Sequence, residues 1–463
     1  MRGLWLFGAL VALSTSPLRA APVSAAPLRA APASTAPLHA ASASTDLSAL
    51  DLLELQIGYT TLLATYDGPV TPRQVAGGAR DGVAAYLVSR GIDDATLPYV
   101  PQRLERDDGG ELIDRTVLGA LLHYGQRLHA DDVVQAALAG EAASLRDPYT
   151  LLFHPVAFKR FNAFLGNQKF GGIGAIVSVE PSGARARVES VIPSSPAQRA
   201  GLQPADEIVA IDDRPLAGKG ADQIRTMLRG KIGTTVRLAV DRAGSPLPAP
   251  LVIVRAAVSQ PVVLARTLAD NVGYVQLTRF GDDAAAQLAA AVKDFRSRAV
   301  SALVLDLRGN GGGYGEEAKK VASQFIAAGP IFTMRERGGA THIERATGHV
   351  TFSGRMAVLV DGDTASAAEI VAGALQDDGR AIIVGTKTFG KGVVQSVFPL
   401  PDGAALKVTT ARYVTPKGRN IDRAGITPDV VIAEPPDAKR GYPETDPQLA
   451  RALAVVGRAS AMV

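Results

Sequence analysis

Residues 364–395 read TASAAEIVAGALQDDGRAIIVGTKTFGKGVVQ, and their pattern indicates the fold class of the second half of the chain. It follows an apolar strand pattern at 357–360 and a turn, and its first part is a helix pattern at 366–377. A second strand pattern at 381–384 leads into a glycine-rich loop. Because strand and helix patterns alternate, the sequence predicts a layered α/β domain whose site lies at the carboxyl ends of the strands.

Ser366 and Lys391 lie where these loops would bring a hydroxyl beside an amine. Ser366 begins the predicted helix, at the positive end of the helix dipole. Glycines on both sides of Lys391 let the backbone approach closely. A lysine is a general base only when neutral, which near pH 7 requires burial that lowers its pKa from about 10.4. Gln395 would share the strand face of Lys391 by twofold alternation and hold the amine. The glycine run 309–313 would supply N–H groups for an oxyanion.

Both halves of this pair have plainer interpretations. Ser366-Ala-Ala-Glu369 is also a capping box, in which the hydroxyl caps the helix, and the pattern alone leaves the two interpretations comparable. The GxxxxGK pattern at 385–391 follows a strand, as a phosphate-binding loop does. Glycine comes next, however, where a metal-binding Ser or Thr is needed, and a strand pattern follows in place of a helix. A nucleotide hydrolase is therefore disfavoured.

Composition excludes several classes of function. The chain has 463 residues, 47% of them hydrophobic and 20% charged, as in soluble globular proteins. The net charge is +4, but three positive residues lie in the first 45, and the remainder lacks the basic excess of a nucleic-acid binder. There is no cysteine, the six histidines form no metal-binding motif, and no GxSxG elbow is present. We therefore expect no metal, no organic cofactor and no nucleic-acid partner.

The N-terminus has the pattern of an exported protein. Arg2 precedes an apolar run at 4–13 and then small residues, which predicts a signal peptide over residues 1–20 with cleavage near 20–25. Residues 21–45 repeat alanine, proline and serine, which predicts a disordered linker. An apolar run of ten is too short to span a bilayer. We therefore expect a secreted or periplasmic protein.

The rest of the chain changes character three times. We expect a helical N-terminal domain at 46–165, a strand-rich domain at 166–257, an α/β core at 258–435 and a C-terminal helical segment at 436–463. Helices are predicted at 72–89, 117–128, 133–145, 221–228, 282–298, 316–327 and 366–377. Strands are predicted at 173–179, 185–191, 207–211, 235–240, 272–277, 302–307, 357–360 and 381–384.

Taken together, these motifs resemble those of the carboxyl-terminal processing peptidases, or tail-specific proteases, a secreted and periplasmic serine–lysine family. The likeness covers roughly residues 145–455. It is carried by DPYT (147–150), FGGIGA (170–175), PSSPAQRAGLQPADEIVAID (193–212), LVLDLRGNGGG (303–313), residues 364–395, TTARYVTPKGRNID (409–422) and GITPDV (425–430).

The resemblance implies a role for each matching site residue. Ser366 would be the nucleophile, Lys391 the general base and Gln395 the residue that orients the lysine. The backbone amides of Gly312 and Ala367 would hold the oxyanion. Position 368 is alanine where the family often has a second serine, which we expect to matter little because the nucleophile precedes it.

The resemblance also implies a PDZ domain at 166–257 and a crotonase-like α/β protease core. In the PDZ domain, the amides of Gly171, Gly172, Ile173 and Gly174 would grip the terminal carboxylate of a substrate that adds a strand to the domain edge. The implied substrates are proteins or peptides with apolar C-termini.

The sequence thus predicts a multidomain α/β chain that is a secreted or periplasmic serine endopeptidase acting on protein C-termini. The alternative is a non-catalytic PDZ adaptor that retains the protease fold. Helical regions in this family serve dimerisation or partner docking, so a homo-oligomer and an activating partner protein both stay open.

Overall fold

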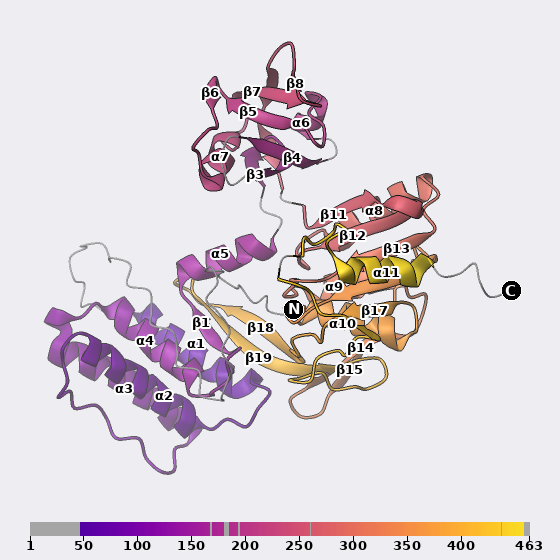
Figure 1. The fold of residues 1–463 in the computed structure, drawn as a ribbon. Coiled ribbons are helices and arrows are strands. Elements are labelled where there is room, and N and C mark those ends of the chain that lie inside the picture. The colour runs from indigo at the N-terminus through magenta and orange to yellow at the C-terminus, as the bar shows by residue number, and fades with distance from the viewer. Residues whose placement is uncertain are drawn as a thin grey trace. The chain divides into compact units, whose positions relative to one another are not determined.

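The computed structural model describes residues 47–166, 169–179, 185–192, 195–259, 261–436 and 438–457. It divides into two compact units, one made of Met1–Arg160 with Leu307–Val463 and the other of Phe161–Asp306. Figure 1 draws the helices and strands of the chain, coloured by residue number. The signal peptide and linker predicted at 1–45 lie outside the described residues. Within the described ranges, no helix has the length and apolar character needed to cross a membrane.

The first unit opens with helices. They are α1 (Ala49–Thr65), α2 (Pro72–Ser89), α3 (Arg106–Tyr124), the short 3-10 turn η1 (Gly125–Arg127) and α4 (Ala130–Ala143). The helix predicted at 72–89 is confirmed, and the Thr71 hydroxyl caps it by accepting the Gln74 N–H at 3.2 Å. The helix predicted at 133–145 begins and ends slightly earlier, as α4.

The start of α3 differs most from the sequence prediction. Its helix was expected from residue 117 but begins at Arg106. Gly109 and Gly110, which have poor helix propensity, hide this first part of the helix from a sequence pattern. In the fold these glycines let α1 approach, since a Cβ at Gly109 would overlap the Tyr59 hydroxyl. That hydroxyl donates a hydrogen bond to the Arg106 carbonyl at 2.8 Å.

The helical region shares its hydrophobic core with a later hairpin. Leu400, Leu406 and Val408 join the buried side chains of α1 to α4 in one cluster. Strand β1 (Leu151–Phe153) pairs with β19 (Ala405–Val414), with Leu151 opposite Lys407. Residues before 165, expected to form a separate helical domain, therefore supply a strand to the sheet of the α/β region, which local sequence patterns do not reveal.

Two sheet segments and three helices complete the first unit. Strand β19 pairs with β18 (Val393–Pro399) along its length, with β1 near its start and with β14 (Pro330–Glu336) near its end, and β15 (Thr341–Arg345) pairs with β14. The parallel strands are β16 (Arg355–Val360), β17 (Ile382–Gly385) and β20 (Val430–Val431). The helices are α9 (Gly315–Ser323), α10 (Ala367–Asp377) and α11 (Pro447–Gly457).

The second unit begins within α5 (Pro155–Leu165) and is mostly strands. They are β2 (Phe170–Gly172), β3 (Ala175–Val179), β4 (Ala186–Val191), β5 (Glu207–Ile211), β6 (Arg214–Pro215), β7 (Thr235–Arg242), β8 (Ser245–Pro246), β9 (Leu251–Val254), β10 (Ala256–Val258), β11 (Val263–Thr267), β12 (Val272–Leu277) and β13 (Ala302–Asp306). Its helices are α6 (Pro196–Arg199), α7 (Ala221–Leu228), the 3-10 turn η2 (Ala269–Asn271) and α8 (Ala284–Ser297). The strands predicted at 207–211 and 272–277 and the helix at 221–228 are confirmed.

Two other element boundaries differ for clear reasons. The strand predicted from residue 173 begins at Ala175, because Gly174 has a φ of +79° that interrupts an extended strand. The helix predicted to reach residue 327 ends at Ser323. Phe325 and Ile326 stay buried in a non-helical segment, so the apolar pattern continues past the end of the helix.

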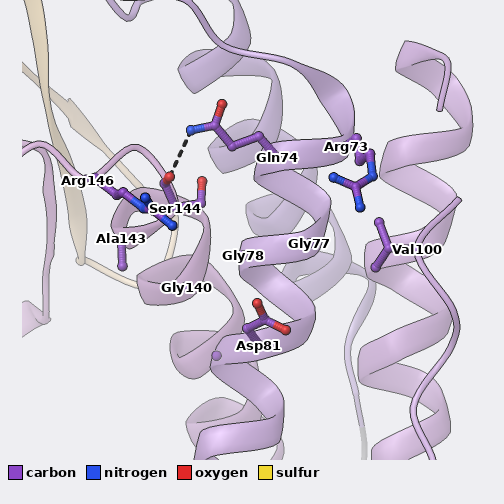
Figure 2. Close-up of a pocket in the computed structure, with 11 residues that line it drawn as sticks. Arg73, Gln74, Gly77, Gly78, Asp81, Val100, Gly140, Ala143, Ser144 and Arg146 are labelled. Carbon is purple, nitrogen blue, oxygen red and sulfur yellow. Dashed lines mark hydrogen bonds between the residues drawn. The ribbon is translucent and has the colours of Figure 1, made fainter. Parts of the chain in front are cut away.

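Helices α2 and α4 cross at unusually close range. A Cβ at Gly82 would overlap the Ala136 carbonyl oxygen, and one at Gly140 would overlap the Gly78 carbonyl oxygen. Gln74 spans the same crossing by donating to the Ser144 carbonyl at 2.8 Å (Figure 2). The contact therefore depends on small residues whose backbones touch.

This crossing generates a stability prediction. Gly82→Ala should lower the free energy of unfolding by about 1–3 kcal/mol, because the new methyl group overpacks the crossing. Gly119→Ala is the matched control: it lies inside α3, and a methyl group added there would meet open space, so the better helix propensity of alanine should raise stability by up to about 1 kcal/mol. Denaturant unfolding of both variants measures this, and equal stability would contradict the close crossing.

Candidate active site

Ser366 lies in a strained turn between β16 and α10. As the N-cap of α10 it has φ 59° and ψ −118°, a backbone conformation that costs a non-glycine residue about 1–3 kcal/mol. Gly312 makes the turn possible, since a Cβ there would lie 2.8 Å from the Ser366 Cβ and 3.0 Å from the Ala367 nitrogen. The Ala365 N–H also donates to the Asn310 carbonyl at 2.9 Å, which fixes the glycine loop against the serine turn.

The Ser366 hydroxyl does not cap the helix. The side chain is fully buried, and in the part of the chain that the structure describes its Oγ has no hydrogen-bond partner. The capping is done by Glu369, whose Oε2 accepts the Ser366 N–H at 2.8 Å. A buried hydroxyl left without a partner is costly in a folded protein and calls for an explanation beyond structure. The geometry therefore favours the chemical interpretation of Ser366 over the capping box.

Lys391 is buried in the loop before β18. Its side chain is 1% exposed, and its Nζ lies 4.7 Å from the centre of the Tyr149 ring. Burial lowers the pKa of Lys391 well below its ordinary value, and the neighbouring charge of Lys407 lowers it further, whereas Asp147 and Glu369 act in the opposite direction. The amine is thus placed where its neutral form is favoured.

A single buried carboxylate ties the serine turn to the lysine loop. Besides the Ser366 N–H, Glu369 Oε2 accepts the Lys391 N–H at 2.9 Å. Glu369 Oε1 accepts the Gly390 N–H at 2.8 Å and the Thr388 hydroxyl at 2.6 Å. Burial raises the pKa of Glu369, and these four hydrogen bonds pull it back toward its usual range. From the sequence pattern, Glu369 was predicted only as a capping residue.

Tyr413 of β19 links the same two segments from their carbonyl side. Its hydroxyl lies 3.1 Å from the Ser366 carbonyl oxygen and 2.8 Å from the Lys391 carbonyl oxygen. Burial raises the pKa of Tyr413 well above 10, so the hydroxyl keeps its proton and acts as the donor. Glu369 and Tyr413 together form a clamp on the backbones of Ser366 and Lys391. Tyr413 carried no sequence signal beyond its place in a motif.

Gln395 is buried as expected of a site residue, but the predicted twofold alternation that would place it on the same strand face as Lys391 does not hold. Strand β18 begins at Val393, so Lys391 lies in the preceding loop and twofold alternation does not extend to it. Gln395 is completely buried and donates to the Thr409 hydroxyl across the β18–β19 pair at 3.4 Å.

The two predicted oxyanion donors lie together at the serine turn, but they differ in their present hydrogen bonding. The Ala367 nitrogen faces the Gly312 turn at the start of α10. The Gly312 N–H, in contrast, donates to Asn310 Oδ1 at 2.9 Å. Asn310 was not predicted as a site residue. Its side-chain oxygen accepts the Gly312 N–H that was expected to bind the oxyanion.

The predicted carboxylate-binding residues form the connection between β2 and β3 of the second unit. Gly171 and Gly172 belong to β2, which pairs with β10, and the Gly171 carbonyl accepts the Gly230 N–H at 3.0 Å. Ile173 is buried in the core of its unit, and its carbonyl accepts the Ala197 N–H at 2.8 Å. Gly174 supplies the positive φ that turns the chain into β3.

A cavity lies on the helical region, away from the predicted site residues. It has a volume of about 680 Å³ and is formed mainly by α2 and α4 (Figure 2). Its lining includes Arg73, Gln74 and Arg146 but none of the site residues predicted from sequence. Within the described ranges, no three histidine or acidic side chains gather closely enough to hold a metal ion.

Comparison with known proteins identifies the family. Residues 271–432 match Peptidase family S41, and residues 187–242 match a PDZ domain. The carboxyl-terminal-processing protease of Picosynechococcus sp. is 34% identical over 333 residues, which cover 70% of this chain and 80% of that protein. The chain belongs to peptidase family S41. The resemblance stated from the motifs, a carboxyl-terminal processing peptidase with a PDZ domain, is thereby confirmed.

Two further matches describe relatives of this S41 chain. The carboxy-terminal-processing protease of Bartonella bacilliformis is 38% identical over 284 residues, which cover 60% of this chain and 65% of that protein. Among solved structures, the photosystem II D1 C-terminal processing protease is 24% identical with a TM-score of 0.47, over 86% of this chain and 96% of that one. The S41 chain is a multidomain α/β serine-type peptidase with a helical N-terminal region and a PDZ domain.

The clamp generates a prediction for this S41 peptidase. Tyr413→Phe removes only the hydroxyl and keeps the ring packed against Phe332, 6.2 Å away. We expect kcat to fall about tenfold, because the two clamped segments lose their shared donor and their alignment loosens. Tyr442→Phe, on an exposed tyrosine, is the control and should leave kcat unchanged. A wild-type kcat for Tyr413→Phe would contradict the clamp.

Proposed function

We propose that this chain is an endopeptidase that processes protein C-termini with a Ser366–Lys391 dyad. The observation that carries the proposal is the joint burial of a hydroxyl without a hydrogen-bond partner and an amine favoured in its neutral form, on two segments held together by Glu369 and Tyr413. A serine nucleophile requires a base positioned in this way.

The dyad accounts for both halves of peptide hydrolysis. Lys391 Nζ takes the proton from the Ser366 hydroxyl as Oγ bonds to the scissile carbonyl carbon. When the tetrahedral intermediate collapses, the C–N bond breaks and the lysine ammonium gives its proton to the leaving amine. Water then attacks the acyl-enzyme and gives a proton to Lys391, and this proton returns to Ser366 Oγ as the new C-terminus departs. Gln395 would orient the lysine amine without adding charge.

The oxyanion donors require one rearrangement. The Ala367 N–H at the start of α10 lies beside the nucleophile and near the positive end of the helix dipole, which suits a developing negative charge. The Gly312 N–H would join it only after leaving Asn310 Oδ1. We therefore propose that Gly312 exchanges Asn310 for the oxyanion when substrate binds, while Ala367 donates throughout.

The second unit would deliver the substrate. In this proposal Gly171, Gly172, Ile173 and Gly174 receive the C-terminal carboxylate of a protein with an apolar tail, which adds a strand to the PDZ domain. The matched relatives are named for C-terminal processing, which supports this assignment. We further propose export to the periplasm or outside the cell, on the N-terminal sequence pattern alone, and leave a homo-oligomer or activating partner as expectations from the family.

Two substitutions test the dyad. Ser366→Ala and Lys391→Ala should each reduce cleavage of a quenched fluorescent peptide with an apolar tail by at least about 1,000-fold, because each removes an indispensable atom. Both variants should still bind the tail, as measured by fluorescence anisotropy. Cleavage that persists in either variant would refute the dyad, and tail binding without cleavage in the wild type would favour the adaptor.

The pH dependence follows from the state of Lys391. The base must be neutral, so cleavage should be slow at low pH and rise to a plateau as the amine loses its proton. Because burial lowers the pKa of Lys391, the rise should end well below pH 10.5. Plotting log kcat/KM from pH 5 to 10 measures it. A rate that falls across this range would assign the base to another group.

A further inference from the structure

A second buried lysine, Lys407, lies on the sheet face that carries Gln395. Lys407 is 6% exposed, and in β19 it stands two residues before Thr409, so the two side chains share one face. Thr409 is the residue that receives the Gln395 amide. Lys407 stands opposite Val397 of β18 on one side and Leu151 of β1 on the other. Lys407 lies outside the motifs that carry the family resemblance.

One chain segment runs past both buried amines. Lys391 Nζ lies 4.7 Å from the Tyr149 ring centre, and Lys407 Nζ lies 5.9 Å from the Phe153 ring centre. The segment is fixed to β19 by the β1 pairing and by the Thr409 N–H, which donates to the Thr150 hydroxyl at 3.0 Å. Each buried amine therefore lies against a ring of the same fixed segment, and the two rings are four residues apart.

Two carboxylates act on the two buried lysines. Asp147 acts on both lysines, and its oxygens accept the Tyr149 N–H at 3.0 Å and the Thr150 hydroxyl at 2.7 Å. Glu369 acts on Lys391 from α10. Burial raises the pKa of Tyr149, so its ring carries no charge near neutral pH. Burial lowers the pKa of Lys407 to about 8, so near pH 7 its amine is still mostly protonated.

We propose that Lys407 is a positioning residue for the peptidase reaction, whose buried positive charge opposes protonation of Lys391 and so keeps the base neutral. The inference rests on the proposed role of Lys391. Coulomb repulsion between two like charges in a poorly solvated site is strong enough to favour the neutral form of one of them. Asp147 attracts both amines and limits this effect. Lys407 thus acts through Lys391 and does not touch the substrate.

The test is the pH profile of cleavage. Lys407→Met removes the charge but keeps the length of the side chain, so the acid limb of kcat/KM should move upward by about one pH unit, and the rate below the limb should fall about tenfold. The plateau at high pH should be recovered. Lys407→Arg keeps the charge and should leave the limb in place. Lys417→Met, at an exposed lysine, removes the same net charge and should not shift the limb.

Three results would overturn the inference. The first is an acid limb of kcat/KM that does not move in Lys407→Met. The second is a Lys407→Met plateau that is lowered at every pH while the limb stays in place. The third is an equal shift of the limb in Lys417→Met. If Lys407→Met fails to fold, Lys407→Gln and a ¹³C NMR titration of Lys391 in the Ser366→Ala background replace it, since the titration needs no activity. If Lys391→Ala loses cleavage and the acid limb of Lys407→Met does not move, only the proposed role of Lys407 is rejected. If Lys391→Ala still cleaves, the dyad itself is rejected.

Discussion

A buried carboxylate and a buried phenol set the geometry on which this site depends. Glu369 accepts the backbone N–H groups of Ser366 and Lys391, and Tyr413 reaches the carbonyl oxygens of the same two residues. A nucleophile and its base react faster when they are aligned before the substrate arrives, because the entropy cost of aligning them is then no part of the reaction barrier. In the proposed mechanism this alignment is made through the backbones of Ser366 and Lys391, which leaves the two side chains available for chemistry.

The same clamp explains how an unfavourable local structure persists. Ser366 has a positive φ and, among the described residues, a fully buried hydroxyl without a hydrogen-bond partner, and burial lowers the pKa of the neighbouring Lys391. Each of these features destabilises the folded chain by itself. The hydrogen bonds that Glu369 accepts, the close approach of Gly312 and the packing of β19 hold them in place. Strain collected in one small, well-supported region is typical of functional sites.

The sequence could predict much of this site because its main features are local. Ser366 at a helix start and Lys391 between two glycines were identified from position and residue type, and the helix at 72–89 from its capping residues. The sequence could not decide between a capping hydroxyl and a reactive one, since both use the same residues. That choice depends on the folded turn, in which Ser366 has a positive φ and, among the described residues, its hydroxyl makes no capping hydrogen bond.

The features that were missed come from contacts between distant parts of the chain. Asn310 binds the Gly312 amide, Tyr413 reaches across from β19, and β1 pairs with β19 although the chain between them contains the whole second unit. Lys407 drew no prediction from the sequence, and in the fold it is buried with Leu151 of β1 opposite it. The start of α3 was missed for the opposite reason, because its glycines weaken the local pattern while they allow α1 to pack.

The most direct measurement is capture of the acyl-enzyme. Turnover of a peptide ester is quenched in acid, and the protein is analysed by intact mass and peptide mapping. The proposed mechanism predicts an acyl group on the peptide that contains Ser366, and its absence when Lys391 is alanine. An adduct on another residue, or continued turnover of the ester with no adduct at any quench time, would contradict the central claim.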